Sequence, residues 1–92
     1  MEFEWDPAKA RENLRVHGID FADAVQIFDR PYLNREDPDA VGEQVFVALG
    51  MDGLGRLLVV AYTYRGDKIR LISARRANKK EGKDYAQRIR FQ

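Results

Sequence analysis

Apolar residues follow helical spacing in the first third of this chain and form strand-like runs over much of the remainder. Phe3 and Trp5 alternate with acidic residues, and this alternation predicts a short, half-buried strand. Two helices, a group of strands and a last helix are then expected in that order. The pattern therefore predicts an α+β domain with helices packed on an antiparallel sheet of three or four strands.

The first helix has a start signal and a stop signal. Asp6 is a good N-cap, and Pro7 suits the first helical position because the N–H that it lacks would have no partner there. Gly18 can adopt the left-handed conformation that ends many helices. We expect a helix from about Pro7 to Arg15 or His17.

A second helix is predicted directly afterwards, with Asp20 as its cap and Pro31 after its end. Its apolar stripe has the spacing i, i+3, i+4 and i+7 and consists of Phe21, Ala24, Val25 and Phe28. Residues 31–39 hold two prolines among acidic residues, and we expect them to be irregular, although Tyr32-Leu33 is weak evidence for an edge strand.

The strands come next. Val45 to Leu49 is predicted to be one, Met51 to Arg56 a turn with two glycines, and Leu57 to Tyr64 a nearly continuous apolar strand of the kind found at a sheet centre. Gly66-Asp67 suits a two-residue hairpin loop, after which a strand runs from Lys68 to about Ala74 or Arg75.

This hairpin predicts a basic face. Its register would put Arg65 opposite Lys68, Thr63 opposite Arg70 and Ala61 opposite Ile72. Because like charges directly opposite each other are unfavourable, we expect an anion between Arg65 and Lys68. That anion could be a phosphate or a carboxylate of the protein, and basic side chains splayed into water are the simplest alternative. Strict alternation would send Arg75 to the face opposite Arg70, so a bulge or the strand end must redirect it if the two act together.

The last helix is predicted from about Lys79 to Arg90. Asn78 and Glu81 form a capping-box pattern, and Tyr85 lies four residues before Ile89, so both can touch the sheet. Glu81 is interpreted first as a cap and only second as a catalyst.

Charge is distributed unevenly along the chain. Residues 1–54 hold five Lys and Arg against twelve Asp and Glu, whereas residues 55–92 hold eleven against three. The basic C-terminal part indicates a polyanion partner, because clustered cations release the counterions condensed on phosphates. Arg75, Arg76, Lys79 and Lys80 lie where a strand end meets a helix start, a place suited to a backbone phosphate.

The 92 residues make a single domain. With no cysteine, no signal peptide and no apolar run long enough for a membrane span, the cytoplasm is the expected setting and no membrane partner is expected. One histidine, no cysteine and scattered carboxylates predict no metal site.

Several short motifs occur in a specific order over nearly the whole chain. They are Phe3-Glu4-Trp5-Asp6-Pro7-Ala8-Lys9, Asn13, His17-Gly18, Phe21-Ala22-Asp23-Ala24, Phe28, Gly42-Glu43, Leu49-Gly50, Arg70-Leu71-Ile72-Ser73-Ala74-Arg75-Arg76-Ala77, Glu81 and Tyr85. In combination they resemble the BrnT family of bacterial toxins.

This resemblance implies a RelE-like fold and an endoribonuclease that needs no metal or other cofactor, cleaves RNA and halts translation. It also implies a BrnA-like antitoxin, a ribbon-helix-helix protein that blocks the toxin. The toxin would contact operator DNA only through this antitoxin. One departure is visible: family members usually carry Arg shortly after the Glu43 position, where this chain has Gln44-Val45. Activity would fall if that Arg contacts the scissile phosphate, and little would change if it only pairs with Glu43.

Metal-independent RNA cleavage needs a base, an acid and positive charge around the reacting phosphate. The predicted catalytic residues are His17, Arg65, Arg70, Arg75 and Tyr85, and the predicted RNA-binding residues are Lys68, Arg76, Lys79 and Lys80. Each has a structural alternative: His17 could stabilise the end of its helix, and Tyr85 could pack beside Ile89. Glu43 could be a base or a salt-bridge partner. Two other functions compete with this one: a nucleic-acid-binding module without catalysis, and a protein that only binds an acidic partner.

Overall fold

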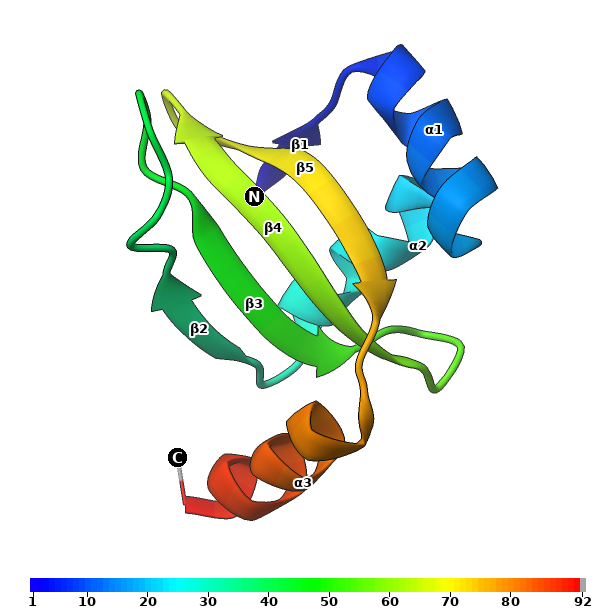
Figure 1. The fold of residues 1–92 in the computed structure, drawn as a ribbon, viewed down its shortest axis with the longest axis vertical. Helices are drawn as coiled ribbons and strands as arrows, with labels where there is room; N and C mark the ends of the chain where they lie inside the picture. Colours follow the sequence, from blue (N-terminus) through cyan, green and yellow to red (C-terminus); the bar gives the residue numbers. More distant parts are fainter. Residues whose placement is uncertain (92) are drawn as a thin grey trace.

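The computed structural model describes residues 1–91 of the chain. Its strands form one sheet, with helices against both faces (Figure 1). In chain order the elements are β1 (Glu2–Glu4), α1 (Pro7–His17), α2 (Phe21–Ala24), the 3₁₀ helix η1 (Val25–Asp29), β2 (Leu33–Glu36), β3 (Phe46–Met51), β4 (Leu57–Arg65), β5 (Lys68–Arg76), α3 (Lys79–Arg88) and the 3₁₀ helix η2 (Ile89–Phe91). The predicted α+β class is confirmed.

Helix α1 begins and ends as its local sequence predicts. The Asp6 carboxylate accepts a hydrogen bond from the Ala8 N–H at 2.8 Å. At the other end Gly18 has φ 70°, and its N–H donates to the Leu14 carbonyl at 2.9 Å. A left-handed residue there costs glycine nothing, so the chain turns at once toward α2.

The second helix is shorter than predicted. Asp20 caps it, but α2 ends at Ala24 and continues as the tighter turns of η1. Pro31 favours an extended conformation for Arg30, which has φ −133° and ψ 167° and closes the helix. The tightening brings Ile27 into the core, fully buried, whereas Phe28 of the predicted stripe is only partly buried.

The sheet has five strands in the order β1-β5-β4-β3-β2, and β1 runs parallel to β5. Strands β2 to β5 are antiparallel and four in number, within the predicted range, and β4 is central as expected; the predicted N-terminal strand β1 adds a fifth, parallel strand, so the expectation of a purely antiparallel sheet of three or four strands was wrong. The irregular segment predicted for residues 31–39 was also wrong, because β2 pairs with β3 inside it. Pro31 and Pro38 flank β2 and remove no N–H from its ladder.

A bulge interrupts the β4–β5 hairpin. Arg65 pairs with Lys68 and Thr63 with Arg70, as predicted, but Ala61 pairs with Ser73 instead of Ile72. Ile72 is the extra residue on β5, so the alternation of faces shifts by one position beyond it. Arg75 therefore points to the same side of the sheet as Arg70.

One face of the sheet is covered by α1, α2 and η1 and forms the core. Its fully buried residues come from α2, η1 and the sheet and include Phe21, Ala24, Ile27, Ala48, Leu58, Val60, Tyr62 and Ala74, while Ala10 of α1 is partly buried against them. Tyr62 stands at the centre of an aromatic group, with its ring 5.2 Å from that of Phe28 and 5.7 Å from that of Phe46. On the opposite face, α3 and its continuation η2 lie at one end of the sheet, while the β4–β5 turn lies at the other end (Figure 1).

Asn13 of α1 joins the helix to the free edge of β5. Its amide donates hydrogen bonds to the Ala74 and Ile19 carbonyls, each at 2.9 Å, and accepts one from the Ala74 N–H at 3.0 Å. Because β1 pairs only with Lys68 to Arg70, this buried side chain replaces a strand partner farther along β5. These hydrogen bonds fix the backbone of β5 at Ala74, next to Ser73 and Arg75.

Within residues 1–91, no helix is both long and apolar enough to cross a membrane.

Candidate functional site

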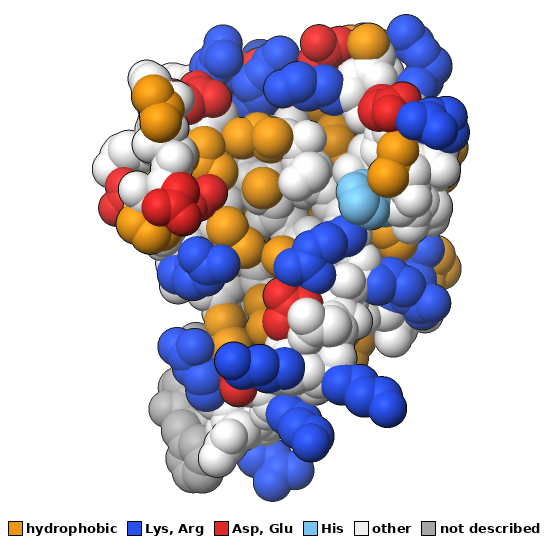
Figure 2. Space-filling view, in the orientation of Figure 1, with side chains coloured by type: hydrophobic (Ala, Val, Ile, Leu, Met, Phe, Trp, Pro, Cys, Tyr) orange, Lys and Arg blue, Asp and Glu red, His pale blue; other side chains and the backbone are white. Residues whose placement is uncertain are grey.

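The sheet face opposite the core is called here the open sheet face. Residues that pair across the strands place their side chains on one side, which identifies the members of this face as Leu33, Arg35, Val47, Leu49, Val59, Ala61, Thr63, Arg70, Ser73 and Arg75. Figure 2 shows it as a floor of hydrophobic side chains bordered by Lys and Arg, with Asp and Glu at the left margin, at the top and among the cations below the floor. The apolar residues of this face are partly buried, apart from the buried Leu33, and an apolar surface bordered by cations is a feature of binding sites for charged partners.

Each of the three arginines predicted to be catalytic pairs with a glutamate. Arg65 lies 3.8 Å from Glu43, and Arg70 lies 2.5 Å from Glu4. The third, Arg75, pairs with Glu81. The anion expected between Arg65 and Lys68 is thus supplied by separate carboxylates, since Lys68 lies 3.8 Å from Glu2. Part of the basic half is neutralised by the acidic half of the same chain.

The Arg75–Glu81 pair has the best geometry of these contacts. Nη1 and Nη2 of Arg75 donate to the two carboxylate oxygens of Glu81 at 2.9 and 2.8 Å, the bidentate arrangement that arginine favours. Glu81 also accepts from the Asn78 N–H at 2.9 Å, and the predicted capping box is confirmed. These hydrogen bonds, those from Arg75 first, outweigh burial and lower the pKa of Glu81 to about 2, with a further contribution from the charge of Arg35.

His17 lies at the C-terminal end of α1, beside the edge of β5. Its side chain lines a cavity of about 270 Å³ together with Ile72 and Ser73. The chain has one histidine, and Figure 2 shows it at the margin of the open sheet face. Ser73 lies between Arg70 and Arg75 along this face, so the cavity borders the stretch that separates the two arginines.

The predicted site does not come together as a whole. Val59 pairs with Arg75 and Arg65 pairs with Lys68, and the six residue steps along β4 between these pairs span about 20 Å. Arg65 and Lys68 therefore sit at the hairpin tip, far from Arg75 and the start of α3 (Figure 1). Arg70 pairs with Thr63, about 7 Å along β4 from the tip and about 13 Å from the level of Arg75, and His17 lies beside Ser73 between the two arginines.

The remaining predicted residues are spread around α3. Arg76 pairs with Leu58, a core residue, and so points away from the open sheet face. Lys79 is exposed at the helix start, whereas Lys80 lines a cleft. Tyr85 directs its hydroxyl to the Pro31 carbonyl at 3.4 Å, and it is not among the residues that line the cleft.

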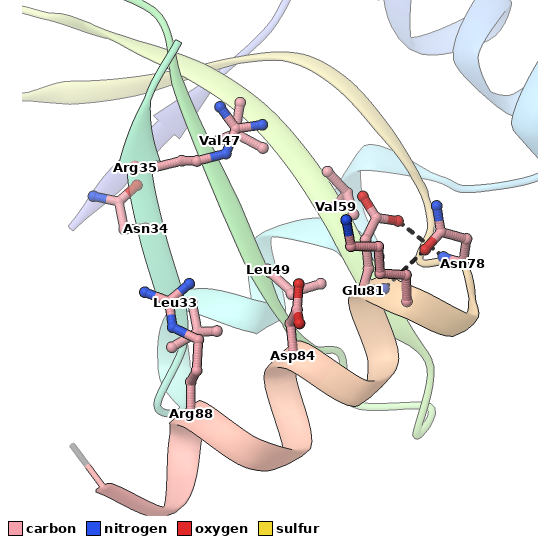
Figure 3. Close-up of a pocket in the computed structure, with 11 residues that line it drawn as sticks. Leu33, Asn34, Arg35, Val47, Leu49, Val59, Asn78, Glu81, Asp84 and Arg88 are labelled. Atoms are coloured by element: carbon pink, nitrogen blue, oxygen red, sulfur yellow. Dashed lines mark hydrogen bonds between the residues drawn. The ribbon is translucent and has the colours of Figure 1, made fainter.

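That cleft lies between α3 and strands β2 to β4 and has a volume of about 340 Å³ (Figure 3). Its floor is aliphatic, and its walls carry Arg35, Lys80, Glu81, Asp84 and Arg88. Sequence reasoning missed Arg35 because β2 was expected to be irregular. The signal for it was the alternation of Leu33 and Arg35, which places both on one face of an edge strand.

Within residues 1–91, Gln44 and Val45, which depart from the family pattern, form no side-chain hydrogen bond with the arginines of β5. The Gln44 side chain donates to Glu36 at 3.0 Å, and its backbone carbonyl accepts from the Thr63 hydroxyl. Glu43 is paired with Arg65 and is half exposed. In the described part of the chain, no three side chains of His, Cys, Asp or Glu are grouped so that they could hold a metal ion.

Comparison with known proteins identifies the family. The family model for the ribonuclease toxin BrnT of type II toxin-antitoxin systems matches residues 5–81. This chain belongs to the BrnT family. The matched range contains α1, the whole sheet from β2 to β5 and Glu81, but not the rest of α3.

A solved structure supports the same assignment at the level of the fold. The crystal structure of the Brucella abortus ribonuclease toxin BrnT, at 1.1 Å resolution, is similar with a TM-score of 0.65 and 24% sequence identity. The similarity covers 86% of this chain and 99% of the Brucella chain. A search of the curated proteins finds no match. The BrnT family resemblance derived from the sequence motifs is confirmed.

Proposed function

We propose that this BrnT family protein is a metal-independent endoribonuclease that cuts RNA and thereby inhibits translation. The observation that carries the proposal is the bulge in β5, which turns Arg75 to the same face as Arg70, with the His17 cavity beside the residues between them. Positive charge and a histidine that can act as a base then border one strip of the open sheet face.

The chemistry requires no metal or organic cofactor. His17 takes the proton of a ribose 2′-hydroxyl, the 2′-oxygen attacks the adjacent phosphorus, and the bond to the leaving 5′-oxygen breaks as that oxygen takes a proton from a water molecule. The products are a 2′,3′-cyclic phosphate and a 5′-hydroxyl. Arg70 and Arg75 stabilise the extra negative charge of the transition state, and a bound phosphate competes with Glu4 and Glu81 for them.

A BrnA-like ribbon-helix-helix antitoxin is the proposed protein partner. The type II toxin-antitoxin family implies an antitoxin, and the open sheet face offers it a partly exposed apolar floor with a charged border. Covering this face would deny RNA access to β5. Contact with operator DNA would then occur through the antitoxin alone.

Cleavage in a chelator tests the enzymatic proposal. The purified protein is incubated with RNA in EDTA, and the ends of the fragments are mapped. We expect cuts that leave a 2′,3′-cyclic phosphate, and we expect His17→Ala and Arg70→Ala to slow them by at least about 100-fold, the usual scale of one proton-transfer group or one charge donor. Arg11→Ala, an exposed change on the same helix as His17, should cut normally.

A second candidate is a binding protein without catalysis. The pairing of Arg65, Arg70 and Arg75 with glutamates favours it, because paired arginines have less charge to offer a transition state. Tight RNA binding without any cleavage in EDTA or in magnesium would support this candidate and overturn the enzymatic one.

A further inference from the structure

The cleft beneath α3 has the features of a site for one flat, charged ligand. Its floor is formed by aliphatic side chains from three strands, Leu33, Val47, Leu49 and Val59. Its volume of about 340 Å³ is at the lower end of the range for small-molecule sites, roughly 300–1,000 Å³. A cleft of this size, roofed by a helix, accepts a single planar group and excludes a stacked duplex.

The walls offer both signs of charge. Three cations face two carboxylates among the lining residues, and Glu81 is already engaged by Arg75. In Figure 3, Arg35 and Arg88 extend from β2 and α3 toward the floor, and Asp84 points from α3 toward Leu49. Within residues 1–91, neither Arg35 nor Asp84 forms an ion pair, so both are available to a ligand.

The cleft is continuous with the strip proposed for cleavage. Val59 forms part of its floor and also pairs with Arg75, and Ala61, two residues along β4, pairs with Ser73. Two residues of a strand span about 7 Å. A chain whose phosphate lies at Arg75 can therefore place a neighbouring base in the cleft.

We propose that the cleft between α3 and strands β2 to β4 binds one unpaired base of the RNA substrate, and that it prefers cytosine to uracil. The aliphatic floor lies under the base, and the planar guanidinium of Arg35 stacks on its other face. Asp84 accepts a hydrogen bond from the exocyclic amino group of cytosine, for which uracil has a carbonyl oxygen. Lys80 lies beside the phosphate. This assignment rests on the proposed function, because it concerns the same substrate.

Non-cleavable RNA separates binding from catalysis. Heptamers of 2′-O-methylcytidine and 2′-O-methyluridine lack the attacking hydroxyl and differ only in the base. Binding to the full chain is measured by fluorescence anisotropy at fixed salt, with a 2′-O-methyl duplex as third probe. We expect the cytidine heptamer to bind about tenfold more tightly than the uridine heptamer, the scale of one well-placed base contact. The duplex should bind more weakly than either.

Three variants assign the effect to the cleft. Asp84→Ala should reduce the preference for cytidine to less than about twofold, because the only acceptor assigned to the amino group is removed. Arg35→Lys keeps the charge and loses the planar group, and it should weaken binding of both single strands by about tenfold. Lys83→Ala, an exposed loss of charge on the same helix, is the control and should change neither quantity by more than about threefold.

Other outcomes overturn the assignment. Equal affinity for the two heptamers, or an effect of Arg35→Lys no larger than that of Lys83→Ala, would mean that these side chains are merely solvated. Melting temperatures of all variants are measured beside the binding curves, and Arg35→Lys preserves an exposed residue of similar size, so misfolding cannot mimic the result. Failure of this assignment can be distinguished from failure of the proposed function. If the proposed function is wrong, wild-type protein leaves ordinary RNA uncut in EDTA, whatever the heptamers show.

Discussion

Replacing Asn13 by alanine should destabilise the protein more than replacing any other residue of α1 by alanine. The side chain donates to the Ala74 and Ile19 carbonyls and accepts from the Ala74 N–H, and only 6% of the residue is exposed. Alanine at this position preserves the helix but leaves three backbone groups without their partner.

The size of the loss follows from those three groups. A buried polar group left unsatisfied costs about 1–3 kcal/mol, so three could cost up to about 9 kcal/mol. Asn13 also lines the cavity beside His17, however, and water entering there can satisfy some of the groups. We therefore expect a loss of about 3 kcal/mol in the free energy of unfolding, a large fraction of the total for a small domain, which is about 5–15 kcal/mol.

Urea unfolding followed by circular dichroism measures this loss, provided that the slope of free energy against urea is unchanged. Arg11→Ala, exposed on the same helix, is the matched control and should cost less than about 0.5 kcal/mol. Asn13→Asp keeps the size and the acceptor but points a carboxylate at two carbonyls, so it should be at least as damaging at pH 7. The reasoning is refuted if Asn13→Ala costs less than about 1 kcal/mol beyond the control.

Three further predictions concern stability. The pKa of Glu81 is lowered from 4.5 to about 2, so its pairing with Arg75 contributes stability above about pH 4.5, and this contribution is lost as the pH falls toward 2. Glu81→Gln should therefore lower the melting temperature at pH 7 and make it fall less steeply in acid. Parallel plots of melting temperature against pH for the two proteins would contradict this. Gly50→Ala should cost about 1–3 kcal/mol in urea unfolding, because a Cβ at this position would lie 3.1 Å from the Ile27 Cβ, and an unchanged midpoint would show that η1 yields easily. Asp52→Ala should cost about 3–5 kcal/mol in urea unfolding, because it removes the fully buried carboxylate that pairs with Arg56 at 2.8 Å. A loss below about 1 kcal/mol would argue against that pairing as a source of stability.

Elements with local signals were predictable from the sequence. Helix α1 begins at a capping aspartate and ends at a left-handed glycine, α3 begins with its capping box, and the β4–β5 turn uses Gly66 at φ 63°. In each case the residues that decide the structure lie within a few positions of one another, so their chemistry acts before any tertiary contact forms. The order of the motifs likewise identified the family from the sequence.

Pairing between distant segments was not predictable in the same way. The edge strand β2 forms because β3 lies beside it, and the parallel β1 forms because β5 does, yet neither short segment would be a stable strand alone. The bulge at Ile72 likewise has no local signature, and it depends on how β4 and β5 fit over the core.

The same distinction between local sequence signals and tertiary contacts applies to the candidate site. The sequence by itself determined which residue types are present: one histidine, a set of arginines in the basic half, and too few ligands for an evident metal site. Tertiary structure alone decided that Glu4, Glu43 and Glu81 pair with three of those arginines, that Arg75 shares a face with Arg70, and that Arg35 lines a cleft beneath α3. Charge and chemical type belong to each residue, whereas the partner of a side chain depends on strand register and on helix packing, which only the complete fold establishes.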